Sequence, residues 1–128
     1  MQIKSGIDII EVERIKSSID EIGDNFLDRV YTENEIQYCE SKKKNKYQSY
    51  AARFAVKEAA FKAISTFIKD KYSISWKNIE TTNDENGRPS VKFSLTKEVE
   101  KELAKIESID VSISHLEKYA VATVNILF

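Results

Sequence analysis

Two carboxylates stand in settings where a charged side chain needs a partner. Asp8 interrupts a cluster of isoleucines near the N-terminus, and Glu58 falls at helical spacing between Phe54 and Phe61 in a long segment without proline or glycine. Burying an unpartnered carboxylate is costly, so each should meet a cation, a hydrogen-bond donor or a metal. Oxygen ligands that leave room for waters and substrate phosphates suit Mg²⁺. The pair therefore indicates a magnesium site, provided that the fold brings the two side chains together.

Each of these residues also has a purely structural interpretation. Glu58 could pair with Lys62 one helical turn later, which stabilises an exposed helix by only about 0.2–0.5 kcal/mol. Asp8 could face solvent on an edge strand or cap the helix that follows. His115 stands just before a turn, where side chains often serve binding, but it could equally be a capping or packing residue. Spacing along the chain leaves both sets of interpretations open.

Several other kinds of site are missing from the sequence. It contains no Gly-x-Ser-x-Gly elbow, no glycine-rich phosphate loop and no cysteine–histidine zinc spacing. The single cysteine, Cys39, excludes an intrachain disulfide, and its neighbours Tyr38 and Glu40 favour a buried, unreactive thiol. These absences argue against a serine hydrolase, a nucleotide-binding loop and a zinc enzyme.

Charge and composition narrow the class of protein further. The formal net charge is −1 and 41% of the residues are hydrophobic, which suits a globular domain and argues against nucleic-acid binding. The lysine-rich run at residues 42–46 favours a solvated loop over a dedicated anion site. The N-terminus shows neither a signal peptide nor a membrane span, so no membrane association and a cytoplasmic location are expected.

Hydrophobic periodicity predicts the elements that must position these residues. The first half of the chain reads as a strand at 3–12, a helix at 11–22 ending at Gly23, a short helix around 26–30, and a helix at 32–41. A capping-box spacing between Thr32 and Glu35 begins that third helix. The longest helical signal runs from 48 to 68, with Tyr50, Phe54, Phe61 and Ile68 on one apolar stripe.

The second half is richer in strand signals. A strand is predicted at 72–82, then a turn at 83–87 whose Asn86–Gly87 pair suits positive φ, and a return strand around 91–93. Thr96 could cap a further helix, and strands are predicted at 111–115 and 119–124. The order predicts an α+β fold of one domain, residues 1–128, with a mostly antiparallel sheet packed against a long central helix.

Four segments give the chain a family resemblance. It resembles the bacterial holo-acyl-carrier-protein synthases, which are small phosphopantetheinyl transferases, at residues 6–15 (GIDIIEVERI), 53–63 (RFAVKEAAFKA), 86–89 (NGRP) and 111–115 (VSISH) with 119–120 (YA). The order and separation of the segments also match, so the resemblance covers essentially the whole chain. It implies transfer of 4′-phosphopantetheine from coenzyme A to a serine of apo-acyl carrier protein, for fatty acid biosynthesis, with release of adenosine 3′,5′-bisphosphate. It also implies a homotrimer with active sites between subunits.

The resemblance implies a role for each matching residue. Asp8 and Glu58 would bind Mg²⁺, and Lys62 would lie by the pyrophosphate. On chemical grounds Glu58, directly or through a metal-bound water, is also the candidate base, so these three are the expected catalytic residues. Arg14 would dock the acidic carrier protein. The expected contacts to coenzyme A are Arg53, Lys62, Ser65, Gly87, Pro89 and His115.

Two departures from the family pattern bear on these expectations. Ser65 stands where the family commonly has glycine, for which altered affinity is expected and not lost activity. Asp20 and Glu21 make the helix that carries Arg14 and Lys16 less basic than usual, which leaves the identity of the carrier open. The alternatives are a non-catalytic coenzyme A- or carrier-binding relative, a transferase for a secondary-metabolism carrier, and, against the charge, a nucleic-acid-binding domain.

Overall fold

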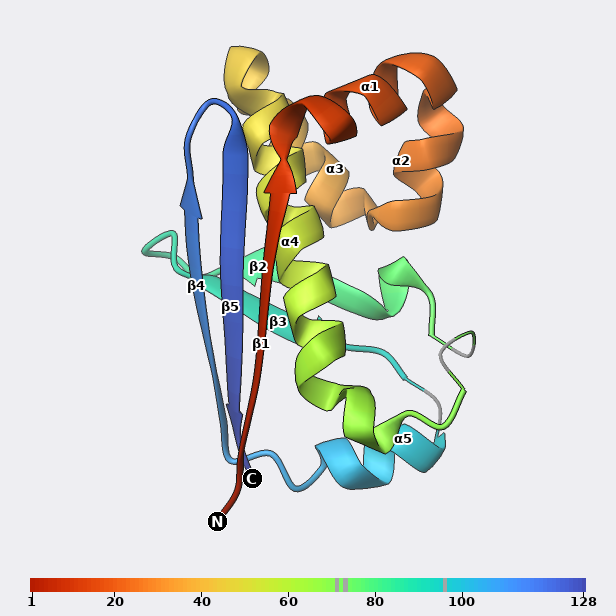
Figure 1. Cartoon of the computed structure of the whole chain (residues 1–128), viewed down its shortest axis with the longest axis vertical. Helices are drawn as coiled ribbons and strands as arrows, with labels where there is room; N and C mark the ends of the chain where they lie inside the picture. The colour runs from red at the N-terminus through yellow and green to blue at the C-terminus, as the bar shows by residue number, and fades with distance from the viewer. Residues whose placement is uncertain (71, 73, 96) are drawn as a thin grey trace.

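The chain folds into one long helix held between two antiparallel sheets (Figure 1). The computed structural model describes residues 1–70, 72, 74–95 and 97–128. Its main elements are β1 (Ile3–Glu11), α1 (Val12–Ile22), α2 (Asp24–Val30), α3 (Glu33–Glu40), α4 (Lys46–Ile64), β2 (Ile79–Asn83), β3 (Pro89–Phe93), α5 (Lys97–Leu103), β4 (Ser108–His115) and β5 (Tyr119–Leu127). The expected α+β class with antiparallel strands and a long helix is confirmed.

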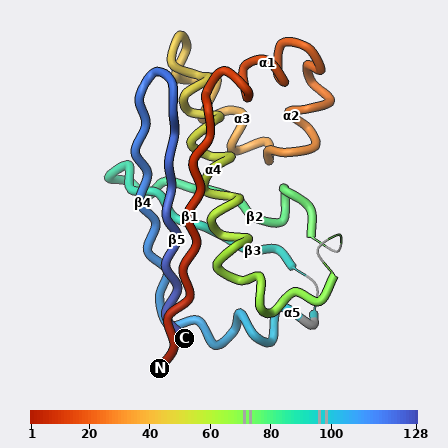
Figure 2. The backbone as a smooth tube through the Cα atoms, viewed as in Figure 1, coloured from red at the N-terminus to blue at the C-terminus, as the bar shows by residue number. Residues whose placement is uncertain are grey.

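The strands form a three-stranded sheet in the order β1–β5–β4 and a separate hairpin of β2 and β3. Helix α4 crosses between the sheet and the hairpin, while α1, α2 and α3 gather at one end of the molecule and α5 lies near the other (Figures 1 and 2). Strands β1 and β4 are therefore the two edges of the three-stranded sheet, on either side of β5.

Helix α4 can lie this deep because it is rich in alanine. Most of its residues are buried, so the core surrounds the helix and is not limited to one stripe. The predicted stripe of large residues is only partly buried at Phe54 and Phe61. Gly6 allows the closest approach of β1, because a Cβ there would lie 1.8 Å from the carbonyl oxygen of Ala59. This contact sets the distance between β1 and α4 at a point two residues before Asp8.

A buried ion pair joins α3, α4 and β2. Lys57 Nζ lies 2.7 Å from Glu35 Oε1, and both side chains are fully buried. Glu35 also accepts the backbone N–H groups of Thr32 and Thr81, at 2.9 Å and 2.8 Å, so the predicted capping box is confirmed and extended to β2. Burial lowers the pKa of Lys57, and the adjacent Glu35 carboxylate opposes that shift. The network fixes the rotation of α4 about its axis.

The predictions differ from the structure mainly after α4. That helix ends at Ile64 and continues as a 3₁₀ turn at Ser65–Phe67. The strand predicted at 72–82 is wrong before Ile79, because Ser75 and Asn78 cap a 3₁₀ turn at Trp76–Asn78. Residue 73 of that segment and the predicted cap at Thr96 lie outside the described residues.

The turn and strand predictions around these segments hold. Gly23 ends α1, and Gly87 has the positive φ, 81°, expected for the hairpin turn. The two C-terminal strands are confirmed and are longer than predicted. Within the described part of the chain, no helix has the length and apolar character needed to cross a bilayer.

Candidate active site

Asp8 and Glu58 line one cavity of about 350 Å³ between β1, α1 and α4. Strand alternation turns Asp8 toward α4, on the same side of β1 as Gly6. Lys62 Nζ lies 3.3 Å from Asp8 Oδ1 and donates to the carbonyl of Ile7 at 2.9 Å. The interpretation of Asp8 as solvent-facing is therefore wrong, and Lys62 pairs with Asp8 instead of Glu58. Asp8 on β1 thus meets two charged side chains of α4, Glu58 and Lys62, that lie about 50 residues further along the chain.

The charges at this cavity suit a bound cation. Partial burial and the nearby Asp8 charge raise the pKa of Glu58, and Lys62 opposes the shift. Among the described residues no group of three or more histidine, cysteine or acidic side chains could hold a metal. A pair of carboxylates is nevertheless the protein share of many Mg²⁺ sites, with substrate phosphate and water as the other ligands. The donor set therefore fits Mg²⁺ bound together with a phosphorylated substrate.

A second cavity, of about 500 Å³, brings together four of the other predicted residues: Arg53, Gly87, Pro89 and His115. Arg53 is only 4% exposed; its Nη2 donates to Asn83 Oδ1 at 2.6 Å, and its Nε is buried without a partner in the described structure. His115 Nδ1 lies 2.9 Å from Gln48 Oε1 of α4. The cavity presents fixed cations and ring nitrogens, as an anionic ligand requires.

Lys42 and Tyr38 also line this second cavity, and the sequence did not single them out as site residues. The guanidinium carbon of Arg53 lies 3.9 Å, and Lys42 Nζ 4.7 Å, from the centroid of the Tyr38 ring. One aromatic ring thus orients two cations. Within the lysine-rich run, Lys43–Asn45 form a short 3₁₀ turn, and Lys42, Lys43 and Lys44 are exposed, as the loop interpretation expected. Its first lysine nevertheless shares the Tyr38 ring with Arg53, a proximity that spacing alone does not reveal.

The Asp8–Glu58 cavity and the Arg53 cavity are separate from each other. Among the described residues none lines both. Strand β1 lines the first cavity, whereas β4, at the opposite edge of the sheet, lines the second together with Asn83 of β2 and Pro89 of β3. The two remaining predicted residues, Arg14 and Ser65, lie nearer the Asp8–Glu58 cavity. Arg14 lines the Asp8–Glu58 cavity, and Ser65 lies just beyond α4, where its Oγ donates to the Lys62 carbonyl at 2.8 Å.

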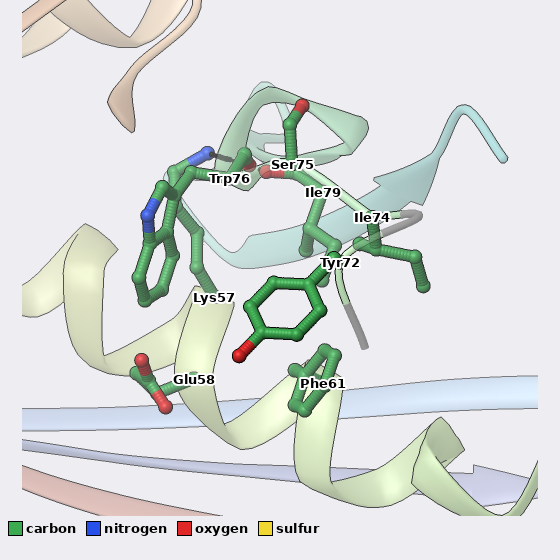
Figure 3. A pocket seen from close by; sticks show the side chains of 8 residues that line it. All are labelled: Lys57, Glu58, Phe61, Tyr72, Ile74, Ser75, Trp76 and Ile79. Atoms are coloured by element: carbon green, nitrogen blue, oxygen red, sulfur yellow. Dashed lines mark hydrogen bonds between the residues drawn. The ribbon is translucent and has the colours of Figure 1, made fainter. Parts of the chain in front are cut away.

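A third cavity, of about 460 Å³, adjoins Glu58 on its other side. Figure 3 shows the rings of Phe61, Tyr72 and Trp76 around this space, with the Glu58 carboxylate at its border. The Trp76 ring also packs against Phe54, with centroids 4.9 Å apart. Glu58 therefore stands between a charged cavity and a largely aromatic and aliphatic one.

Comparison with known proteins gives a consistent result. Residues 4–124 match the family model of the 4′-phosphopantetheinyl transferase superfamily. The chain is 49% identical over 123 residues to the holo-[acyl-carrier-protein] synthase of Ruminiclostridium cellulolyticum, covering 95% of this chain and 90% of that protein. It is 44% identical over 125 residues to the synthase of Koribacter versatilis, covering 97% of each. The Helicobacter pylori synthase in complex with coenzyme A has a similar structure, with a TM-score of 0.80, 32% identity, and coverage of 96% of this chain and 99% of that one.

Proposed function

Because the chain belongs to the 4′-phosphopantetheinyl transferase superfamily, we propose that it transfers 4′-phosphopantetheine from coenzyme A to a serine of an apo-acyl carrier protein. The observation that carries this proposal is the convergence of Asp8, Glu58 and Lys62 at one site. A protein that only bound coenzyme A or a carrier would have no use for two carboxylates at one cavity, where the Asp8 charge helps to raise the pKa of Glu58. Their arrangement supports an enzyme over a binding relative.

Asp8 and Glu58 would hold Mg²⁺ at this cavity. The ion would supply positive charge to the pyrophosphate of coenzyme A. Lys62 approaches from the same side, where its ammonium group neutralises the charge on the leaving phosphate. Its contacts with Asp8 and the Ile7 carbonyl hold that ammonium group in place before substrate arrives.

Glu58 is the base in this proposal. The carrier serine oxygen forms a bond to the β-phosphorus as the bridging oxygen bond breaks, the serine proton passes to Glu58, and adenosine 3′,5′-bisphosphate leaves. The Glu58 carboxylate borders the cavity that would receive the serine, which is the position that a base requires. Phosphoryl transfer depends mainly on positioning and electrostatics, so few functional side chains are needed.

The other parts of coenzyme A have matching surfaces. The 3′-phosphate and the adenine ring of coenzyme A fit the second cavity. Arg53, Lys42 and His115 would contact the phosphate, and the Gly87–Pro89 turn would contact the adenine ring. The pantetheine arm fits the cavity beside Trp76, because that space begins at Glu58 and is largely aromatic and aliphatic. Ser65, next to Lys62, would contact the pyrophosphate end.

We also propose that the active site is completed in a homotrimer. One subunit would supply Asp8, Glu58 and Lys62, and its neighbour the cavity that contains Arg53. Two observations support this: the halves share no lining residue among those described, and the outer face of β1 exposes Ile3, Ile7 and Ile9. Exposed apolar side chains grouped on a sheet face are typical of association surfaces.

The decisive experiment is intact-mass measurement of an apo-acyl carrier protein incubated with this protein, coenzyme A and Mg²⁺. We expect a phosphopantetheine mass shift that EDTA abolishes. A folded protein that binds coenzyme A but modifies none of several carriers would instead be a non-catalytic relative. The carrier of fatty acid synthesis, a cytoplasmic reaction, is the first to test, and competition with a secondary-metabolism carrier identifies the preferred substrate.

A further inference from the structure

Helix α1 forms one wall of the cavity that contains Glu58. Arg14 and Ser18 of α1, together with Phe26 of α2, line that cavity beside Asp8 and Glu58. Any protein that presents a serine to Glu58 must therefore cover this face of α1. The charges along the face then act on the incoming protein at short range.

The face carries opposite charges at its two ends. Residues 14, 18 and 21 follow helical spacing, so Glu21 lies on the same face as Arg14, about 10 Å further along the axis. Both side chains are exposed, and neither forms an ion pair within the described structure. Ile22, 51% exposed, adds apolar contact area next to Glu21.

The other charges of α1 are turned away from this face, and two of them, Glu13 and Lys16, line a separate cavity beside Tyr47. Asp20 accepts a hydrogen bond from the Tyr47 hydroxyl at 3.2 Å, and Lys16 Nζ lies 5.7 Å from the centroid of the same ring. These two side chains are thus already engaged toward the start of α4. Within the described structure, Arg14 and Glu21 remain as the free charges of the face that borders the cavity.

We propose that this surface selects a carrier protein of mixed charge, with an acidic side chain opposite Arg14 and a lysine or arginine opposite Glu21. The proposal rests on the transferase function above. A uniformly acidic carrier would place like charges together at Glu21, which weakens association and disfavours that docking register. A basic group at that point would pair with Glu21 and fix the direction in which the carrier lies along α1.

A charge-reversal scan tests the proposal. Each exposed acidic residue around the acceptor serine of an apo-acyl carrier protein is changed singly to lysine, and kcat/KM is measured with the wild-type enzyme, Glu21→Lys and Asp28→Lys. Asp28 is the matched control, because it makes the same charge change on α2 but lies about 200° around that helix from Phe26, away from the cavity. We expect one carrier reversal to raise kcat/KM with the wild type by about 2- to 5-fold, the range for an exposed ion pair.

With Glu21→Lys that same carrier reversal should lower kcat/KM, while Asp28→Lys should behave as the wild type. The difference in kcat/KM between the carrier variants should arise from KM for the carrier and should become smaller at high salt. If Glu21→Lys and Asp28→Lys rank the carriers identically, the polarised surface is refuted while the transferase function stands. If the wild type modifies no carrier at all, both proposals fall.

Discussion

At the level of single residues, Glu58 has an unfavourable setting for a charge. It is half-buried, and Asp8 lies at the same cavity. Its raised pKa means that the folded chain binds the proton of the neutral form more tightly than the unfolded chain does. The stability that this neutral form provides is present at low pH and is lost as pH rises through the folded-state pKa. Under the proposed function, this loss of stability at neutral pH would accompany a carboxylate placed to bind a cation.

We accordingly expect Glu58→Gln to have opposite effects on stability and activity. Without metal at neutral pH its Tm should exceed that of the wild type, and the difference should narrow as pH falls and Glu58 takes up its proton. Mg²⁺ should raise the Tm of the wild type only. Turnover should fall by at least ~10²-fold, the scale for loss of one preorganised electrostatic element.

Differential scanning calorimetry across pH and the intact-mass rate assay give these quantities. Glu85→Gln, a change at an exposed residue of the hairpin turn, is the control and should alter neither the Tm nor the turnover rate. Near-normal turnover by Glu58→Gln would remove Glu58 from the catalytic residues.

Lys42 provides a second prediction at this scale. Lys42→Ala should raise KM for coenzyme A about tenfold, equivalent to ~1.4 kcal/mol, with little change in kcat, because a charge-assisted contact to phosphate is lost away from the reacting bond. Lys92→Ala, an exposed lysine on β3, is the matched control. Dephospho-coenzyme A, which lacks the 3′-phosphate, should bind both Lys42→Ala and wild type equally; a persisting difference would contradict the phosphate contact.

At the level of elements, the contact between β1 and α4 decides where Asp8 lies. We expect Gly6→Ala to lower the free energy of unfolding by about 3 kcal/mol, because its Cβ would overlap the backbone at Ala59 and push the strand away. Activity of the folded fraction should fall as well, since Asp8 moves with β1. Urea unfolding and the rate assay measure the two effects.

Gly23→Ala is the comparison for the Gly6 variant. Gly23 has a φ of 73° and a ψ of −141°, and a Cβ added there would meet nothing within 4 Å, so only backbone strain of about 1–3 kcal/mol should result. Its activity per folded molecule should be unchanged. An equal loss of activity per folded molecule in the two variants would mean that the close contact at Gly6 does not position the site.

At the level of the whole molecule, the proposed assembly of one active site from two subunits predicts complementation between variants. Lys62→Ala removes a cation from the first half, and the double variant Lys42→Ala/His115→Ala alters the second; all three side chains are exposed, so folding should survive. Co-expression should restore activity above that of either protein alone, because random mixing leaves about one quarter of the interfaces with both halves intact.

Light scattering should report a trimer for the wild type and both variants. Ile9→Glu, on the exposed face of β1 where Ile9 is 65% exposed, should yield a folded monomer with little activity. Absence of complementation in co-purified mixed assemblies would place both halves of the site within one subunit.

The sequence by itself determined the local elements and the family. Periodicity and capping predicted the helices through α3 and the C-terminal strands, because these signals depend on residues a few positions apart. Four short segments identified the family, which the comparisons confirmed. The strand predicted before Ile79 failed because a local side-chain cap at Ser75 and Asn78 outweighed the apolar pattern.

Only the tertiary structure decided which charges meet. Lys62 pairs with Asp8 on β1 and not with Glu58 on its own helix, and Lys42 lines the same cavity as Arg53. Spacing along the chain cannot reveal such meetings, since they depend on how closely β1 approaches α4 at Gly6 and how the buried Lys57–Glu35 pair sets the rotation of that helix. The separation of the two cavities likewise depends on long-range strand pairing, because β1, which lines the first, and β4, which lines the second, pair with opposite sides of β5.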